Sequence, residues 1–413
     1  MYRSSELRLD AVPYRKTQAG AALLIILLLL ISAASFIFVK KLYRGIGFRS
    51  EDAMATANAL AQAKAALIGR ALSDSSRPGS LPCPDLMTNI PGTNIPNDGR
   101  ADLLAGNDCP SYVGRLPWYT LRLGDLRDGD GERLWYGLTT TLRDDTSAQP
   151  INSATSGQLT VDGTIADIVS VIVSPGSAVS NPPAIDQQRN AGPNDVTNYL
   201  EDDNSDGDVN FATTAAGDFN DRVVYITRQE LMQLVEKRVL GEARLELQSY
   251  YSTNNYYPYA ADLGSSTGSR WGMNGQLEGF LPIDAGGTSP NPPIPFPSPG
   301  WFRQNQWPNF VYYTLANACQ STTPGCAGTG FLNVDGATNV QALLVSAGRA
   351  ITTPPFAVKG SAQDRTSLPP PPPPWPVNEY LDSAENSNGD AVYDAVGTPI
   401  TPSYNDQMKI VAP

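Results

Sequence analysis

The longest apolar stretch of the chain is Ala21–Val39, which contains no charged residue. At a helical rise of about 1.5 Å per residue, this stretch spans roughly 28 Å, the hydrocarbon thickness of a bilayer. Basic residues stand on both sides of it, Arg15 and Lys16 before and Lys40 and Lys41 after. The pattern predicts a helix that crosses a membrane once, and the flanking charges do not orient it.

Two further stretches have helical patterns. Residues 51–74 are rich in alanine and repeat apolar residues at helical spacing. Gly45 and Gly47 are weak points between this pattern and the apolar stretch, because glycine is a poor helix former. In residues 227–251, Thr227 and Glu230 have the spacing of a capping box. We expect one long N-terminal helix, half in lipid and half on a domain, and a second helix in mid-chain.

The rest of the chain contains an internal duplication. The apolar run that follows residues 159–163 resembles the run that follows residues 332–336. Three short motifs then recur in the same order, a Tyr-Leu-acid, an Asn-Ser-x-Gly-Asp and an aromatic-Asn-Asp motif. They occupy residues 199–201 and 380–382, 204–208 and 386–390, and 219–221 and 404–406. Several matches in one order indicate two tandem copies of one module.

Composition and charge limit the function. The 413 residues carry a net charge of −12, which argues against a nucleic-acid partner because such a partner needs a basic face. There is no histidine, so Ser-His and Cys-His catalysis are excluded. No phosphate loop, nucleophile elbow or dinucleotide fingerprint occurs. We therefore do not expect an enzyme.

The four cysteines are Cys83, Cys109, Cys319 and Cys326. None has CxxC spacing, which argues against a zinc site. Their even number and spacing predict two local disulfides, Cys83–Cys109 and Cys319–Cys326. Disulfides persist only in an oxidising compartment, so they place the bulk of the chain outside the cytoplasm. Four unpaired thiols are the alternative.

One acidic loop resembles the first half of an EF-hand. Carboxylates and an amide alternate before a glycine, as calcium loops require, but the bidentate glutamate is missing and Thr213 takes its place. No cofactor is required by the sequence, and calcium is the one candidate ligand. The alternative is a solvated acidic turn, and the sequence favours neither. The candidate calcium ligands are Asp202, Asn204, Asp206, Asp208, Asp218 and Asp221.

The N-terminus resembles that of a type IV prepilin, with a basic leader that ends at Gly20 before a long apolar helix. The resemblance implies that prepilin peptidase cleaves between Gly20 and Ala21, with methylation of the new N-terminus. It also implies that the helix mediates assembly through Ala21, Leu24, Ile25 and Leu28. The fifth mature position, usually Glu in major pilins, is Ile25 here, which resembles minor pilins and the tip pseudopilin of type II secretion. An uncleaved signal anchor is the alternative.

The resemblance implies an α+β fold. Residues 1–20 would be the leader, residues 21–39 the transmembrane and assembly helix, and residues 40–227 and 228–413 two tandem pilin-like modules. Each module is expected to be a helix packed on an antiparallel β-sheet, since runs such as Ile168–Val173 are rich in β-branched residues.

The implied function is that of a structural component, a minor pilin or pseudopilin of a type IV pilus or type II secretion-like fibre. Its partners would be other pilin or pseudopilin subunits, prepilin peptidase and the inner membrane. We expect a single-pass protein of the bacterial inner membrane, with its C-terminal bulk periplasmic or on a cell-surface fibre. A non-polymerising, calcium-binding membrane-anchored adhesin or receptor domain is the first alternative, and an anchored periplasmic hydrolase the second.

Overall fold

The fold comes from a computed structural model in which the described residues begin at Glu51. Contacts group Thr56–Pro413 into one compact unit and Met1–Ala55 into another. Within the larger unit we call residues 56–227 the first half and residues 228–413 the second half. The described residues are 51–88, 90, 95–104, 108–144, 149–182, 185–189, 195–215, 217–265, 268–286, 289–296, 300–365, 377–394 and 401–413.

Residues 51–73 are helical and bury one face in the first half. The alanine-rich sequence favours a helix, and its apolar residues recur every three or four positions, so they share that face. The helix ends at Asp74, whose carboxylate accepts hydrogen bonds from the backbone N–H groups of Ser76 and Arg77 at 2.9 and 2.7 Å. The buried face consists of Thr56, Ala59, Leu60, Ala63, Leu67 and Ala71.

The sheet of the first half is built around its longest strand, β4 (Ile165–Ser174). β4 pairs antiparallel with three strands, and its residues from Ile168 onward are all buried. Such a run of β-branched residues suits a central strand covered on both faces. The strands around it are β1 (Val113–Arg115), β2 (Trp135–Leu138), β3 (Leu159–Val161), β7 (Asn210–Phe211) and β8 (Arg222–Thr227), and β5 (Ser180–Asn181) pairs separately with β6 (Ile185–Asp186).

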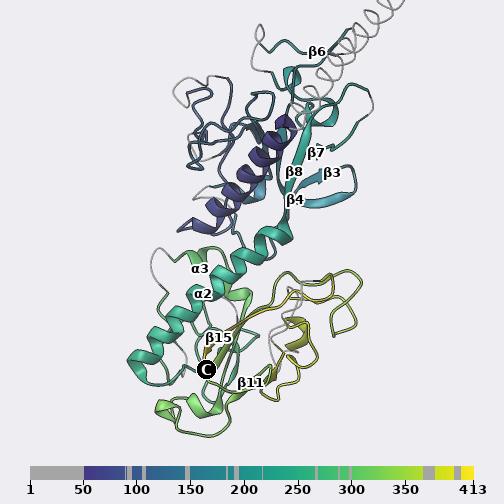
Figure 1. Cartoon of the computed structure of the whole chain (residues 1–413). Helices are drawn as coiled ribbons and strands as arrows, with labels where there is room; N and C mark the ends of the chain where they lie inside the picture. The colour runs from purple at the N-terminus through teal and green to yellow at the C-terminus, as the bar shows by residue number, and fades with distance from the viewer. Residues whose placement is uncertain are drawn as a thin grey trace, which may run out of the picture. The chain divides into compact units, whose positions relative to one another are not determined.

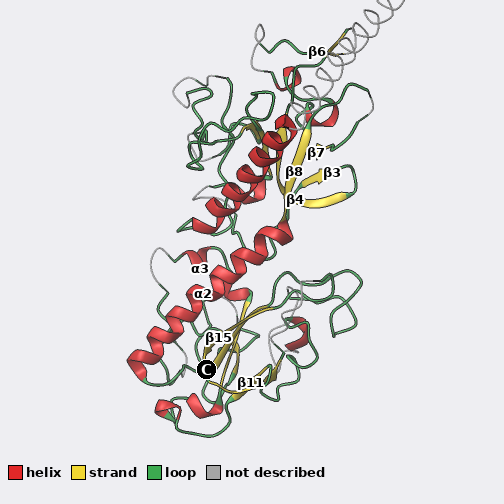
Figure 2. Ribbon diagram, viewed as in Figure 1, coloured by secondary structure: helices red, strands yellow, loops and turns green. Residues whose placement is uncertain are grey.

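Helix α2 (Arg228–Asn254) opens the second half directly after β8. The Thr227 cap of the predicted capping box is confirmed, because its side chain accepts a hydrogen bond from the Glu230 N–H at 3.0 Å. The Glu230 carboxylate forms an ion pair with Lys64 at 2.9 Å. The helix ends at Asn255, whose left-handed backbone (φ 62°) is typical of a C-terminal cap. Its buried face packs against β15 and β13, and Figure 2 shows α2 running beside that sheet.

The second half contains two further sheets. One joins four strands in the order β15 (Gln407–Ala412), β13 (Ala342–Ser346), β10 (Val311–Leu315) and β9 (Glu278–Phe280). The other has three strands in the order β12 (Ala337–Val340), β11 (Leu332–Val334) and β14 (Val392–Tyr393). A short helix, α3 (Trp301–Gln304), adds buried aromatic residues to the core.

The two halves repeat the same strand pairings. Figure 1 shows one long helix beside the strands of each half, the purple helix 51–73 near β4 and β8 and the teal α2 near β15. β1 pairs with β2 as β9 pairs with β10, and β4 pairs with β8 as β13 pairs with β15. The duplication even includes one parallel pair in each half, β3 with β7 and β11 with β14. The repeated sequence motifs therefore mark equivalent places in two similar scaffolds.

The predicted fold class is wrong. Among the residues from Glu51 onward that the structure describes, no helix is long and apolar enough to cross a membrane. The long helix that is present, α2, carries charged side chains along its length and buries one face in protein. The sheets also differ from the expected antiparallel ones, because each half contains a parallel pair. A pilin-like module with a purely antiparallel sheet is therefore not what this chain forms.

The same finding contradicts the predicted location, a single-pass protein of the bacterial inner membrane, and the membrane-anchored, pilin-type character that this prediction assumed. In the described part of the chain, no helix has the required combination of length and hydropathy. The apolar stretch Ala21–Val39, on which that prediction depended, lies outside the described residues.

Two buried tyrosines test whether the halves are held together by equivalent contacts. The hydroxyl groups of Tyr136 and Tyr313 donate to the carbonyl oxygens of Pro82 and Pro258, each at 3.0 Å. Replacing either tyrosine by phenylalanine leaves a buried carbonyl unpaired, so we expect each variant to lose about 1–3 kcal/mol of unfolding free energy. Urea denaturation measures both losses. Tyr119→Phe is the control, because Tyr119 is 52% exposed, and a loss in only one half would contradict the equivalence.

Candidate functional site

The predicted processing and assembly site lies outside the described residues. This applies to the cleavage position between Gly20 and Ala21 and to the assembly residues Leu24, Ile25 and Leu28. Their roles stay predictions that follow from the prepilin resemblance.

Both predicted disulfides are present. Cys83 pairs with Cys109 and Cys319 pairs with Cys326, with Cα atoms 5.4 and 4.1 Å apart. Each bridge closes a local loop, and three of the four cysteines are buried. The cysteines of the described chain are therefore used for cross-linking and hold no metal.

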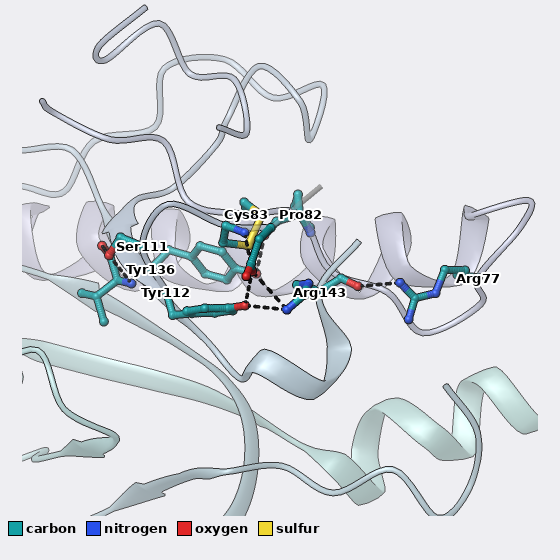
Figure 3. The surroundings of a disulfide bond; sticks show 10 residues. Arg77, Pro82, Cys83, Ser111, Tyr112, Tyr136 and Arg143 are labelled. Atoms are coloured by element: carbon teal, nitrogen blue, oxygen red, sulfur yellow. Dashed lines mark hydrogen bonds and ion pairs between the residues drawn. A yellow bond between two sulfur atoms is a disulfide. The ribbon is translucent and has the colours of Figure 1, made fainter. Parts of the chain in front are cut away.

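The first disulfide belongs to a hydrogen-bonded network (Figure 3). Next to Cys83, the Pro82 carbonyl accepts a hydrogen bond from Tyr136 of β2. Arg143 donates to the Tyr112 hydroxyl at 2.9 Å, and its own carbonyl oxygen accepts from Arg77 at 3.0 Å. The network connects the segment after helix 51–73 to the disulfide loop and to the sheet, so the bridge has a structural role.

The two bridges should differ in how much they stabilise the protein. The cysteines are separated by 26 positions in the first bridge and by 7 in the second. Because the entropy removed from the unfolded chain grows with loop length, we expect losses of about 3.5 kcal/mol for Cys83→Ser/Cys109→Ser and about 2.5 kcal/mol for Cys319→Ser/Cys326→Ser. Urea denaturation of the two double variants measures the difference, and a larger loss for the second pair would contradict the loop-length argument.

The predicted calcium loop is a hydrogen-bonded turn. The Asn204 amide is buried and accepts from the Ala212 N–H at 2.9 Å while donating to the Ala212 carbonyl at 3.1 Å. Asp206 accepts from the Asp208 N–H at 3.0 Å, and Asp208 accepts from the Asn210 N–H at 2.6 Å. Each of these side chains accepts a hydrogen bond from the backbone of its own loop.

The other three candidate ligands are Asp202, Asp218 and Asp221, and hydrogen bonds to other residues are seen for the last two. Asp202 begins a short 3₁₀ helix with a left-handed backbone (φ 50°), Asp218 accepts from Asn181, and Asp221 accepts from the N–H of Glu201. Within the described ranges, no three acidic or cysteine side chains are placed to hold a metal ion. The calcium site therefore stays a prediction, beside the alternative of an acidic turn.

What the structure brings together instead is a pair of buried carboxylates in each half, which we call the carboxylate pairs. In the first half the Glu201 N–H donates to Asp221 at 3.0 Å, and in the second the Asp382 N–H donates to Asp406 at 2.7 Å. The residue before each of Asp221 and Asp406 donates back, Asn220 to Glu201 at 3.2 Å and Asn405 to Asp382 at 2.7 Å. Each pair joins the last strand of its half to a distant loop.

A glutamine and an arginine complete each carboxylate pair. Gln187 donates to Glu201 at 2.6 Å, and Gln363 donates to Asp382 at 2.9 Å. Two positions after each glutamine, an arginine donates to backbone carbonyls, Arg189 to Gly176 at 2.5 Å and Arg365 to Gly348 at 2.8 Å. These four residues were missed in the sequence. A Gln-x-Arg motif precedes each Tyr-Leu-acid motif and was the signal that could have found them.

Burial dominates the electrostatics of these pairs. Burial, with the neighbouring Glu201 charge second, raises the pKa of Asp221 to about 8. Burial, followed by the Asp382 charge, raises the pKa of Asp406 well above its ordinary value. Burial also raises the pKa of Glu236, on α2, to about 7. A carboxyl that keeps its proton at neutral pH can donate a hydrogen bond, which suits a structural role in a dry core.

A second candidate site lies on the side of helix 51–73 that faces away from the core, which we call the outer face. Its residues are exposed and lie three or four positions apart, so they share one side of the helix. They are Asn58, Ala61, Ala65 and Gly69. A Cβ atom added to Gly69 would meet no atom within 4 Å. The exposed Gln62 borders this face with a longer, unbranched side chain. The short side chains would allow another helix to approach closely.

Comparison with protein-family models, with curated proteins and with solved structures finds no match to this chain.

Two buried carboxyls, Asp221 of the first carboxylate pair and Glu236 on α2, predict how stability changes with pH. In the unfolded chain these carboxyls ionise near pH 4, as ordinary carboxyls do. In the folded protein Asp221 and Glu236 keep their protons up to about pH 8 and about pH 7. The folded state binds more protons in between, so the free energy of unfolding falls as the pH rises from about 5 to 8.

Urea denaturation at several pH values measures this slope. No imidazole titrates in the same window, because the chain has no histidine, and Asp74, Asp125 and Asp284, whose pKa values are lowered, act below about pH 4. Asp221→Asn should flatten the slope, whereas Asp203→Asn, an exposed control, should leave it unchanged. A stability that rises between pH 5 and 8 would contradict the assignment.

Proposed function

We propose that the chain is a structural subunit that assembles with pilin-type or pseudopilin-type subunits into a fibre related to type IV pili or type II secretion. The observation that carries the proposal is the outer face of helix 51–73. The inner face of this helix is anchored in a core, while the four residues of the outer face are exposed and short. Helices pack at about 8–10 Å only where their side chains permit it, so this face suits another helix. The prepilin-like sequence that precedes the helix supports the class of partner.

The chemistry of the described polar groups supports an assembly role over a catalytic one. The buried carboxylates, amides and arginines of both halves are used in binding backbone groups, as in the contacts of Asp221, Asn204 and Arg365. Two disulfides close local loops. Such features make a rigid scaffold that can hold one helix face in a fixed orientation.

Site-specific photo-crosslinking tests this assignment. With a photoreactive phenylalanine at position 61 or 65, we expect crosslinks to pilin-type subunits expressed in the same cell, identified by mass spectrometry. The matched control is position 245, because Leu245 is 64% exposed on α2. Crosslinks at the helix 51–73 positions and none at the control would support the proposal.

A substitution gives an independent readout. Ala65→Arg places a long charged side chain on the outer face, so co-purification with those subunits should fall at least tenfold, while Leu245→Arg should leave it unchanged. Both positions are exposed, so unfolding free energies should stay within about 0.5 kcal/mol of the parent. A monomeric protein that forms no crosslink at position 61 or 65 would overturn the proposal and favour a non-polymerising adhesin or receptor domain.

A further inference from the structure

The second half borders a pocket of about 770 Å³, within the size range of small-molecule sites. Three arginines line it, Arg270, Arg349 and Arg365, and none of its described lining residues is Asp or Glu. This is unusual in a chain with a net charge of −12. The local excess of positive charge favours an anionic ligand.

Arg270 is the residue with donor capacity to spare. It is only 3% exposed, and its Nη2 donates to the Asn309 side-chain oxygen at 2.5 Å. Its Nη1 is buried without a hydrogen-bond partner. A buried guanidinium nitrogen with no acceptor is costly. Arg270 lines the pocket, so an anion that reached this nitrogen would remove that cost. Burial lowers the pKa of Arg270 to about 10, so the group stays charged at neutral pH.

The duplication shows that this arginine is particular to the second half. In the first half Arg115 stacks over Trp135 and Tyr199, at 4.5 and 4.2 Å from the ring centroids. Gly-Arg-Leu-Pro at residues 114–117 corresponds to Gly-Phe-Leu-Pro at residues 279–282, so Phe280 stands at the matching position of the second half. Phe280 meets Tyr380 edge-to-face at 5.2 Å. The guanidinium comes instead from Arg270, in a loop, at 4.0 Å from the centre of the Phe280 ring.

The two other arginines differ in how much they are already used. Arg365 donates to the carbonyl oxygens of Ala347, Gly348 and Tyr380 at 2.8–2.9 Å, so it is held by the backbone. Arg349 contacts Asp167 at 3.3 Å and its side chain is 42% exposed. Arg349 can therefore turn towards a ligand at the edge of the pocket.

Three carboxylates that do not line the pocket, Asp284, Asp382 and Asp406, also interact with these arginines. The backbone N–H of Arg270 donates to Asp284, but Asp284 forms its own ion pair with Arg303. Asp382 and Asp406 act electrostatically on Arg365. These carboxylates do not line the pocket. The pocket lining therefore carries the positive charge of its arginines and no carboxylate.

The remaining lining residues suit a ligand that also carries hydroxyl groups. Gln306 and Asn309 line the pocket with amide side chains, and Thr352 with a hydroxyl. The amide of Asn152, which also lines it, is bound to Asn305 and Ala154. Phe280, Phe310 and Tyr380 supply apolar ring surface. We propose that this pocket binds an acidic sugar of the uronate class, whose carboxylate pairs with Arg270 and Arg349 while its hydroxyl groups meet the amides. The proposal is independent of the fibre assembly proposed above.

Calorimetric titration with glucuronate tests the site, and glucose is the neutral probe of the same ring size. We expect glucuronate to bind at least tenfold more tightly than glucose, and this preference to shrink as salt is added. Arg349→Gln and Arg270→Gln should each weaken glucuronate binding at least tenfold. Arg127→Gln is the matched control, because the Arg127 side chain is 47% exposed and lies outside the pocket lining.

Because Arg270 is buried, its replacement could destabilise the fold, and urea denaturation of each variant checks this. The exposed Arg349 keeps the test decisive if Arg270→Gln unfolds. Equal binding of glucuronate and glucose, no binding of either, or glucuronate affinity unchanged in Arg349→Gln would overturn the proposal.

Discussion

In each half of the folded unit, a buried carboxylate accepts hydrogen bonds from the backbone that enters the last strand. Glu201 does this before β8 and Asp382 before β15. Asp221 and Asp406 in turn accept from the N–H groups of Glu201 and Asp382 in the distant loops. Backbone N–H groups that leave water need a partner, and an ionisable side chain in a dry core needs hydrogen bonds or a proton. Each carboxylate pair satisfies both needs, and the order of the final strand depends on it.

The carboxylate pairs also bind residues of the irregular segments, through a glutamine in each half. Through Gln187 and Gln363 they connect to the neighbouring arginines, which in turn bind carbonyl oxygens of the turns that follow β4 and β13. A chain with many glycines and prolines has long irregular segments, and these contacts replace the ladder hydrogen bonds that such segments lack. The disulfide Cys83–Cys109 acts in the same way on another loop.

Two copies of one scaffold have also diverged at a specific place. The matching positions Arg115 and Phe280 both pack against the tyrosine of the Tyr-Leu-acid motif, Tyr199 in one half and Tyr380 in the other. With phenylalanine in place of arginine, the core of the second half lacks a charge at this position, and Arg270 supplies one from a loop. The scaffold keeps its hydrophobic and hydrogen-bonded frame while the charge beside the pocket changes. Duplicated modules permit this, because one copy can retain the original contacts.

Features that depend on short-range chemistry could be predicted from the sequence. Thr227 and Glu230 had the spacing of a helix cap, the cysteines paired with near neighbours, and the repeated motifs marked equivalent places, because each of these depends on residues close in the chain or on direct comparison of two copies. The partners of groups that are far apart in the chain became known only from the tertiary structure. The alternation of a strand does not specify its neighbour or its direction, so the parallel pairs of β3 with β7 and β11 with β14 could not be predicted. The burial of Asp221, which accepts a hydrogen bond from the Glu201 N–H, could not be predicted either, since burial depends on packing from elements far away in sequence.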